Sequence, residues 1–263
     1  MLTQPNGEFE WVQASWGPAL RCRSIHVPHL FSTRALELRG GDKPAAGWEQ
    51  LAATLGVAPG NVFRPTQVHG DAAVVVPSDA VASSSSRTPL SAPADIIMTS
   101  NGDVAVAVQA ADCVPLLLLD SRSGAVAAAH AGWRGTAAGV ALSTTRAMAQ
   151  HFGTRAADLI VAIGPSIGPC CYQVGEELLG HFGSQGRRWF YRLPGGWMLN
   201  LWSANRDQLV EAGVKAENIH VAELCTAMHP DLFDSYRRDG TGTGRMAAVI
   251  RATRARNAPD KTP

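Results

Sequence analysis

Three side chains that could bind a metal ion, or act as a nucleophile and its base, stand out in the sequence: His69, Cys113 and His130. Each lies beside a glycine or at the end of a predicted strand, where a bend in the backbone exposes the side chain. Two neutral imidazoles and a thiolate suit Zn²⁺, and three protein ligands leave the fourth position for water or substrate. Because the spacing matches no zinc-finger motif, three alternatives stay open: Cu²⁺ bound by the same ligands, a Cys113 nucleophile with His130 as its base, and ordinary core or loop residues.

Arginines form a second candidate group, because several of them lie in turns rich in glycine or serine. A guanidinium in such a turn suits a phosphate or a carboxylate, and a helix expected to begin near Gly135 would add backbone N–H groups. A solvated surface position is the plain alternative for any one of them. The members are Arg34, Arg134, Arg237, Arg238 and Arg245.

The elements that must position these residues lie between residues 103 and 136. Two apolar runs, 104–108 and 114–119, are typical of strands buried on both faces. The break between them carries Cys113 and Asp112, a carboxylate that is either a catalytic group or a residue that only orients its turn. A third run, 125–129, leads to His130, and a helix is expected to follow. Chemistry at strand ends beside a helix start is the usual arrangement in an α/β protein.

The rest of the chain alternates short strands with helices, which predicts an α/β fold. We expect helices at 48–55, 136–152, 174–182 and 201–212, and strands within 61–66, 72–76, 95–99, 159–163, 219–222 and 246–250. Residues 78–94, rich in Ser, Ala and Pro, predict a mobile loop inside the domain. Residues 183–196 and 233–244 are expected to be loops, and the polar tail from about 253 to be disordered.

The composition limits the classes of partner. The 263 residues carry a formal net charge of +1, so we expect no binding to nucleic acid or to a membrane. The N-terminal residues lack the basic start and the apolar stretch of a signal peptide, so we expect none. No apolar run is long enough to span a membrane. The five scattered cysteines form no disulfide framework, so we expect the cytoplasm. For adjacent Cys170 and Cys171 we expect mainly a packing role.

The sequence resembles the YfiH-type laccase-domain family, in order from Phe31 to Ile250. Members of this family have been described as polyphenol oxidases and as purine nucleoside phosphorylases. The resemblance rests on QVHG (67–70), ADCVPLLL (111–118), HAGWRG (130–135), IGPSIGPCCYQVG (163–175), LCT (224–226) and SYRRDG with TGRMAAVI (235–250).

The resemblance implies one layered α/β catalytic domain over 1–263, with mixed sheets flanked by helices. It implies a zinc site made by His69, Cys113 and His130. The implied activity is phosphorolysis of adenosine, inosine and S-methyl-5′-thioadenosine, together with adenosine deamination, so the implied partners are a nucleoside and phosphate. Cys113, His130 and Asp112 are then the candidate catalytic residues. The candidate substrate and phosphate ligands are Arg34, Gln67, Arg134, Arg237 and Arg238.

Several positions depart from the family pattern. The GGVS segment that usually follows Ser-Thr-Arg is replaced by ALELRGG at 35–41, and Gln173 and Asn200 replace the usual Glu and Asp. The rivals to the zinc phosphorylase are a metal-free Cys/His hydrolase, an editing hydrolase of a cell-wall precursor, a binding module with a vestigial site, and a copper-dependent polyphenol oxidase. Eight histidines are too few for a multicopper oxidase. No pattern predicts the oligomeric state.

Overall fold

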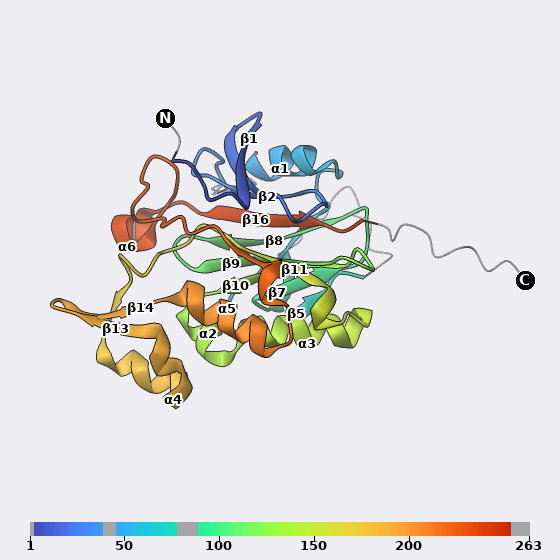
Figure 1. The fold of residues 1–263 in the computed structure, drawn as a ribbon. Helices are drawn as coiled ribbons and strands as arrows, with labels where there is room; N and C mark the ends of the chain where they lie inside the picture. Colours follow the sequence, from blue (N-terminus) through green and yellow to red (C-terminus); the bar gives the residue numbers. More distant parts are fainter. Residues whose placement is uncertain (1–2, 39–45, 78–88, 254–263) are drawn as a thin grey trace, which may run out of the picture.

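Two large β-sheets lie face to face in the middle of the molecule, and helices cover their outer faces (Figure 1). The computed structural model describes residues 3–38, 46–77 and 89–253. The layered α/β architecture with mixed sheets and flanking helices is therefore confirmed.

The first sheet has seven strands and brings the two ends of the sequence together. Its last strand, β16, lies between β3 and β8, and β4 runs parallel to β8 and β6 while the other pairs are antiparallel. In sheet order the strands are β1 (Phe9–Ala14), β2 (Gly17–Cys22), β3 (His29–Ser32), β16 (Met246–Arg251), β8 (Ala105–Ala110), β4 (Val62–Thr66) and β6 (Pro89–Pro93).

The second sheet has six strands, and its centre is the predicted apolar stretch. Strands β9 and β10 are buried along their whole length, as the uninterrupted apolar runs predicted. In sheet order the strands are β15 (Ile219–Val221), β11 (Leu159–Ile163), β9 (Val114–Asp120), β10 (Val126–Ala131), β7 (Ile96–Thr99) and β5 (Ala73–Val75).

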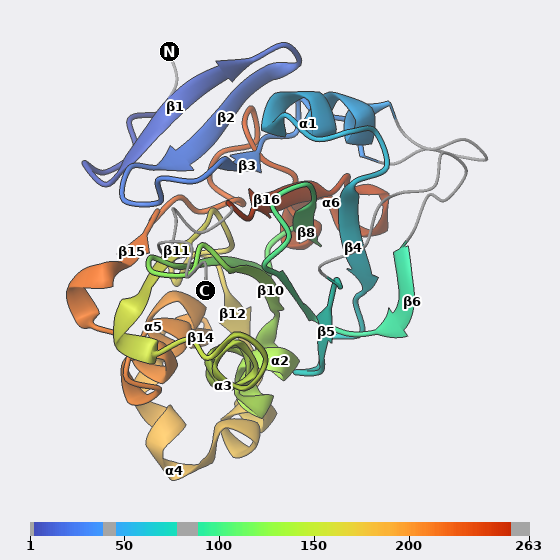
Figure 2. The same cartoon turned by 90° about the vertical axis from the view of Figure 1, so that its right-hand side faces the viewer.

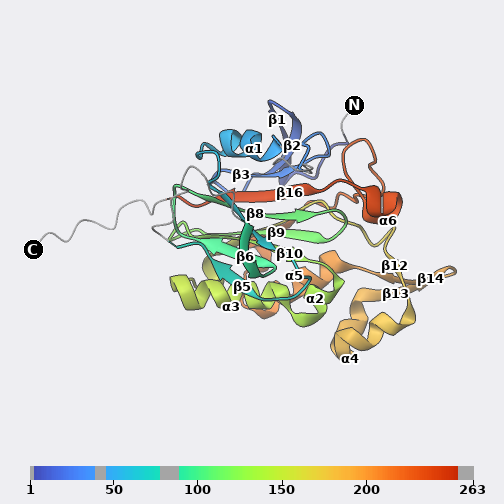
Figure 3. The same cartoon turned by 180° about the vertical axis from the view of Figure 1, so that it is seen from behind.

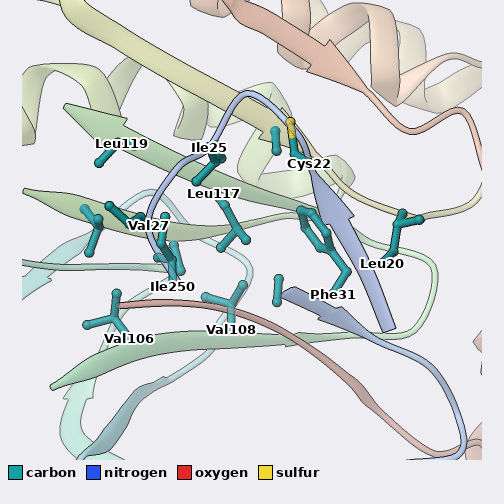
Figure 4. Close-up of a cluster of buried hydrophobic side chains, with 14 of the residues drawn as sticks. Leu20, Cys22, Ile25, Val27, Phe31, Val106, Val108, Leu117, Leu119 and Ile250 are labelled. Atoms are coloured by element: carbon teal, nitrogen blue, oxygen red, sulfur yellow. The ribbon is translucent and has the colours of Figure 1, made fainter. Parts of the chain in front are cut away.

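The main core fills the space between the two sheets. Figure 4 shows Val106, Val108 and Ile250 of the first sheet facing Leu117 and Leu119 of the second. All five side chains are fully buried. Truncating such a leucine to alanine costs about 2–5 kcal/mol of stability, because the removed methyl groups leave a cavity. This core fixes the spacing of the sheets, and so the positions of the turns at their ends.

Helices close the two outer faces. Helix α1 covers the first sheet, and α3 and α5 lie against the second (Figure 2). A small third sheet and helix α4 extend beyond the second sheet (Figure 3). The helices are α1 (Gly47–Leu55), α2 (Trp133–Ala138), α3 (Val140–Phe152), α4 (Gly183–Gly186), α5 (Leu201–Glu211) and α6 (Tyr236–Asp239). The third sheet is formed by β12 (Gln173–Val174), β14 (Gly196–Leu199) and β13 (Phe190–Leu193).

Most predicted elements are confirmed, with local reasons for their ends. Helix α1 ends at Gly56, whose φ of 67° is the left-handed conformation of a helix C-cap. Helix α5 begins at Asn200, whose side-chain oxygen accepts a hydrogen bond from the N–H of Ser203. The predicted strands on either side of Cys113 are β8 and β9, and the third apolar run is β10.

Five predicted elements are wrong in part. The single helix at 136–152 is two helices, because Gly139 has a φ of 87° and ends the first. Residues 89–93 of the predicted loop pair with β4 as β6, while 78–88 lie outside the described residues. The helix at 174–182 is a 3₁₀ helix over Glu176–Phe182. The loops at 183–196 and 233–244 contain α4, β13 and α6. The predicted disordered tail lies almost wholly outside the described residues, at 254–263.

No helix in the described ranges is both long and apolar enough to cross a membrane.

Candidate metal centre

His69, Cys113 and His130 converge at one end of the sheets. Their ligand atoms all lie within 4.8 Å of one another, and the two imidazole rings are 4.9 Å apart in an edge-to-face arrangement. His69 follows β4, Cys113 lies in the turn between β8 and β9, and His130 is the last residue but one of β10. In tetrahedral coordination, zinc bonds of about 2.0–2.1 Å to nitrogen and about 2.3 Å to sulfur place two ligand atoms of one ion roughly 3.3–3.6 Å apart. The three side chains therefore fit a shared ion after a small closing movement.

Asp95 holds two of these side chains in place. Its carboxylate is fully buried directly before β7, and its Oδ1 accepts a 2.8 Å hydrogen bond from Nδ1 of His130. Its Oδ2 accepts the N–H groups of Val68 and Gly70, at 3.1 and 2.7 Å, on either side of His69. Because Nδ1 of His130 is engaged, Nε2 is the atom left for a metal. A carboxylate that accepts a hydrogen bond from the other ring nitrogen of a metal-binding histidine orients that ligand in many metalloproteins.

Sequence reasoning missed Asp95. The only signal was a charged residue directly before a buried strand, where an unpaired carboxylate would be costly.

The backbone turns sharply at two positions of the site. His69 has a φ of 64° and Asp112 a φ of 85°, in the left-handed region that residues with a Cβ rarely adopt. Each such conformation costs about 1–3 kcal/mol, which the surrounding contacts must offset. At His69 the contacts are the two N–H groups bound by Asp95. The bends let His69 and Cys113 face each other from different strands.

Two glycines of the HAGWRG segment make room for the ligands. A Cβ on Gly132 would lie 2.9 Å from Sγ of Cys113 and 3.0 Å from Cδ2 of His69. A Cβ on Gly135 would lie 2.9 Å from the carbonyl oxygen of Gly70. Any larger residue would therefore push the loop that carries His69 away from Cys113.

Cys113 and His130 shift each other's pKa towards the charged form of each side chain. Burial alone would raise the pKa of Cys113, but the positive His130 and the hydrogen bonds of both imidazoles lower it to about 6. Burial likewise opposes the charge on His130, yet the Cys113 thiolate and Asp95 raise its pKa to about 9. A thiolate beside an imidazolium can bind a soft metal once the imidazolium loses its proton, or act as a nucleophile.

Both carboxylate oxygens of Asp112 accept hydrogen bonds from neighbouring segments. Its Oδ1 accepts the hydroxyl of Thr226 and its Oδ2 accepts the backbone N–H of Arg237, both at 2.6 Å. Its backbone oxygen also accepts the N–H of Ile167. This arrangement favours the interpretation in which Asp112 orients the turn that carries Cys113, over a role in proton transfer.

A cavity of about 710 Å³ opens beside the three ligands. Trp133, Ile167 and Tyr172 contribute apolar surface to its lining, and Tyr236 lies at the exposed edge. Burial raises the pKa of Tyr172 to about 12, so its hydroxyl stays protonated at neutral pH. The volume and the mixture of aromatic and polar groups suit a ligand the size of a nucleoside.

Three arginines line the same cavity: Arg134, Arg237 and Arg245. Arg237 lies 5.1 Å from the centre of the Tyr172 ring and donates to the carbonyl oxygen of Gln173 at 2.8 Å. Arg134 lies 4.6 Å from the centre of the Trp133 ring. Within the described ranges none of the three forms an ion pair with a carboxylate. The cavity therefore offers positive charge to an anionic ligand.

Arg34 and Arg238 do not line the cavity. Arg34 pairs with Asp234 at 3.7 Å and donates to the carbonyl oxygen of Pro230. Arg238 donates to the carbonyl oxygens of Thr226 and Phe233, both 2.8–2.9 Å away. Both guanidinium groups thus tie loops together.

Gln67 lines the cavity, but both ends of its amide are already used. Its Nε2 donates to the carbonyl oxygen of Gln109 and its Oε1 accepts the N–H of the same residue, each at 2.8 Å. This pair of bonds extends the contact between β4 and β8 up to the His69 loop.

Residues 22–253 match the model of a family described as multi-copper polyphenol oxidoreductase laccase. The chain belongs to this laccase-domain family. Among its relatives is a purine nucleoside phosphorylase of Deinococcus radiodurans, 36% identical over 248 residues, or 89% of this chain and 92% of that protein. A purine nucleoside phosphorylase of Bacteroides thetaiotaomicron is 35% identical over 203 residues, 73% of each chain. Adenosine deaminase RL5, from an unknown prokaryotic organism, is 35% identical over 161 residues, 59% of this chain and 61% of that protein.

Solved structures in the laccase-domain family have the same fold. The YfiH protein of Bacillus licheniformis superposes with a TM-score of 0.81 at 28% identity, covering 89% of this chain and 96% of that one. YlmD of Geobacillus stearothermophilus superposes with a TM-score of 0.77 at 30% identity, covering 92% and 98%. The resemblance to YfiH-type proteins noted in the sequence is therefore confirmed.

Proposed function

We propose that this laccase-domain protein is a zinc-dependent purine nucleoside phosphorylase that also deaminates adenosine. The observation that carries the proposal is one cavity lined by His69, Cys113 and His130 together with three arginines, none of which forms an ion pair with a carboxylate of residues 3–38, 46–77 or 89–253. An open metal site beside an anion site suits a reaction between phosphate and a nucleoside. The names of the relatives agree with this substrate class.

The donor set fits zinc. His69, Cys113 and His130 would hold the ion as two imidazoles and a thiolate, and Asp95 would keep His130 in the required tautomer. When bound, zinc lowers the pKa of a coordinated water to roughly 7 and polarises oxygen or nitrogen groups of a substrate. A multicopper oxidase needs several histidine-rich copper sites. The described residues contain one metal-ligand cluster with histidine, which favours the zinc enzyme over the oxidase.

Other residues of the cavity would bind phosphate and the purine and hold them in place. Arg134, Arg237 and Arg245 would bind phosphate and hold it facing the ribose C1′ of the nucleoside. Trp133 and Tyr172 would hold the purine by stacking. The protonated hydroxyl of Tyr172 would donate a hydrogen bond and carry no charge. Asp112, next to Cys113 in the turn, would hold that turn against Thr226 and the backbone of Arg237 through its two hydrogen bonds.

A metal-free Cys/His hydrolase is the second candidate. The low pKa of Cys113, about 6, favours a reactive thiolate with His130 as its partner. An editing hydrolase of a cell-wall precursor would use the same residues on another substrate. Both differ from the first proposal in their products and in their response to metal.

The deciding experiment incubates zinc-loaded protein with adenosine, with and without phosphate. We expect adenine and ribose 1-phosphate only with phosphate, and inosine in both mixtures. A chelator should abolish both activities and added Zn²⁺ should restore them. Absence of adenine, inosine and hypoxanthine from the zinc-loaded mixtures would overturn the proposal. Full activity in protein without detectable metal would replace the zinc mechanism by the thiol mechanism.

We further propose that residues 1–263 act as one catalytic domain in the cytoplasm. The pairing of β16 with both β3 and β8 supports the first part, because it joins distant segments in one sheet. The five cysteines are all free, which suits a reducing compartment. Limited proteolysis that released a stable fragment carrying the metal ligands would contradict a single domain.

A further inference from the structure

A second group of sulfur atoms lies outside the proposed zinc centre. The Sγ atoms of Cys170, Cys171 and Cys225 all lie within 4.8 Å of one another, and those of Cys170 and Cys171 are 3.6 Å apart. Cys225 is 5% exposed, Cys171 is half-buried and Cys170 faces solvent. An ion could therefore reach the group from one side.

The backbone brings these thiols together through neighbouring strands. The loops after β11 and β15 leave the same edge of the second sheet, because the two strands are parallel. Beyond the strands the loops stay paired: Ser166 forms a bridge with Cys225, and its carbonyl oxygen accepts the N–H of Thr226 at 3.0 Å. Cys170 and Cys171 follow a few residues later in the first loop.

The buried end of the group is held firmly. The N–H of Gly168 donates to Sγ of Cys225 at 3.2 Å. A Cβ on Gly168 would lie 2.8 Å from the Trp202 ring and 3.2 Å from Cβ of Cys225. Trp202 in turn donates from Nε1 to Oγ of Ser166 at 2.7 Å. The site is thus preorganised on one side by packing and hydrogen bonds.

We propose that Cys170, Cys171 and Cys225 bind one thiophilic monovalent metal ion, with Cu(I) as the ion of this class. Three sulfur donors select soft ions such as Cu(I). Within the described residues no imidazole or carboxylate joins the group, so the mixed four-ligand set of a structural zinc site is incomplete. On binding, three S–H groups release their protons to solvent as three S–Cu bonds form. No electrons are transferred, because the metal arrives and stays as Cu(I).

The protonation of the free thiols fits this chemistry. Burial raises the pKa of Cys171 to about 12 and also raises the pKa of Cys170. Neutral thiols are slow in disulfide exchange, whereas a soft ion can displace their protons. The site is distinct from the zinc centre, but Tyr172 and Arg237 connect the two: Tyr172 follows Cys171 and lines the cavity, and Arg237 donates to the carbonyl oxygen of Cys171 at 3.5 Å.

Titration with buffered Cu(I) tests the proposal. Fully reduced, anaerobic protein, with all five thiols accessible to a reagent after denaturation, is titrated against a colorimetric Cu(I) chelator. The proposal expects one tightly held equivalent per chain, with thiolate-to-copper charge-transfer absorption and no loss of bound zinc. The same equivalent should remain in Cys113→Ala, which removes the sulfur of the zinc centre. Cu(I) binding by Cys113→Ala therefore tests the sulfur site separately from the proposed function of the zinc centre.

Two variants decide where the copper binds. Cys170→Ser alters an exposed side chain and Cys225→Ser a buried one, and each should weaken Cu(I) binding by at least tenfold. Cys22→Ala, at a buried cysteine outside both groups, should bind as the parent does. Because Cys170 is exposed, its variant gives a result even if Cys225→Ser fails to fold. Retention of the copper in Cys170→Ser, stoichiometric zinc release during titration, or no copper held against the chelator would each overturn the proposal.

Discussion

Nδ1 of His130 donates a 2.8 Å hydrogen bond to Oδ1 of Asp95, and the other oxygen of this carboxylate holds the backbone on both sides of His69. One buried side chain thus sets the positions of two proposed metal ligands that are 61 residues apart in sequence. Because Asp95 lies directly before β7, the geometry of the site depends on the correct placement of that strand.

Asp95→Asn should weaken zinc binding. The amide keeps the shape but loses the negative charge that orients and polarises His130, a change that typically costs 10–100-fold in metal affinity. Competition with a zinc chelator measures the effect. Asp231→Asn, at an exposed carboxylate that does not line the cavity, is the matched control. Equal zinc affinity in both variants would remove Asp95 from the metal site.

Cys113→Ser should lose both zinc and activity. A serine hydroxyl stays protonated near neutral pH and is a far poorer zinc ligand than a thiolate. His130→Ala should behave in the same way. Metal content by mass spectrometry and product formation from adenosine are measured together. If the parent already holds negligible metal while active, and the variant loses activity alone, the thiol nucleophile is the correct mechanism.

Arg134→Ala and Arg245→Ala should impair the use of phosphate. A charge-assisted hydrogen bond contributes about 1.5–3 kcal/mol, so the KM for phosphate should rise roughly tenfold or more in at least one variant. Adenosine deamination, which uses no phosphate, should change much less. Arg122→Ala, at a largely exposed arginine paired with Asp158, is the control. An unaltered KM for phosphate in both cavity variants would exclude these arginines as its ligands.

Gly132→Ala should reduce zinc affinity at least tenfold without unfolding the protein. The added Cβ would lie 2.9 Å from Sγ of Cys113, so the thiolate or the turn must shift. Gly180→Ala adds a methyl group where nothing lies within 4 Å, and should bind zinc normally. Zinc titrations with thermal unfolding separate the two effects. Normal zinc binding by Gly132→Ala would show that the site tolerates this displacement.

Stability should fall in mild acid because of His29. This side chain is 3% exposed, its Nδ1 donates to the carbonyl oxygen of Val27, and its Nε2 accepts the N–H of Cys22. Burial lowers the pKa of His29 from 6.5 to about 4. Between these pH values His29 is therefore protonated in the unfolded chain and neutral in the folded protein. The free energy of unfolding should therefore decrease as the pH falls through this window, by roughly 3 kcal/mol in total.

Urea unfolding of the parent and of His29→Gln at several pH values measures this contribution. The variant should show a flatter dependence between pH 4 and 6.5, whereas His26→Gln, at an exposed histidine, should follow the parent. Identical profiles for the parent and His29→Gln would contradict the assignment.

The sequence predicted the proposed metal ligands better than their surroundings. In the sequence His69, Cys113 and His130 stand beside glycines or at the ends of apolar runs. In the structure they lie at strand ends and in turns. Asp95 could not be found in this way, because the groups that it binds lie 25 and more residues away and share no spacing with it. An arginine side chain is long and flexible, so the sequence could not separate Arg237, which lines the cavity, from Arg238, which ties loops together.

The layers were predictable, but the order of strands was not. Apolar runs show that β9 and β10 are buried on both faces, yet nothing in a run says which strand lies beside it. The pairing of β16 with β3 and β8 depends on long-range contacts.

The place of β16 has a consequence for synthesis on the ribosome. During translation β3 and β8 emerge long before the strand that will lie between them, so both present open edges to solvent or to each other. Only when residues 246–251 have left the ribosome can the seven-stranded sheet close. A nascent chain stalled before that point would already contain the three proposed metal ligands. It would lack β16, the strand that joins the two parts of the sheet, and would depend on chaperones to avoid aggregation.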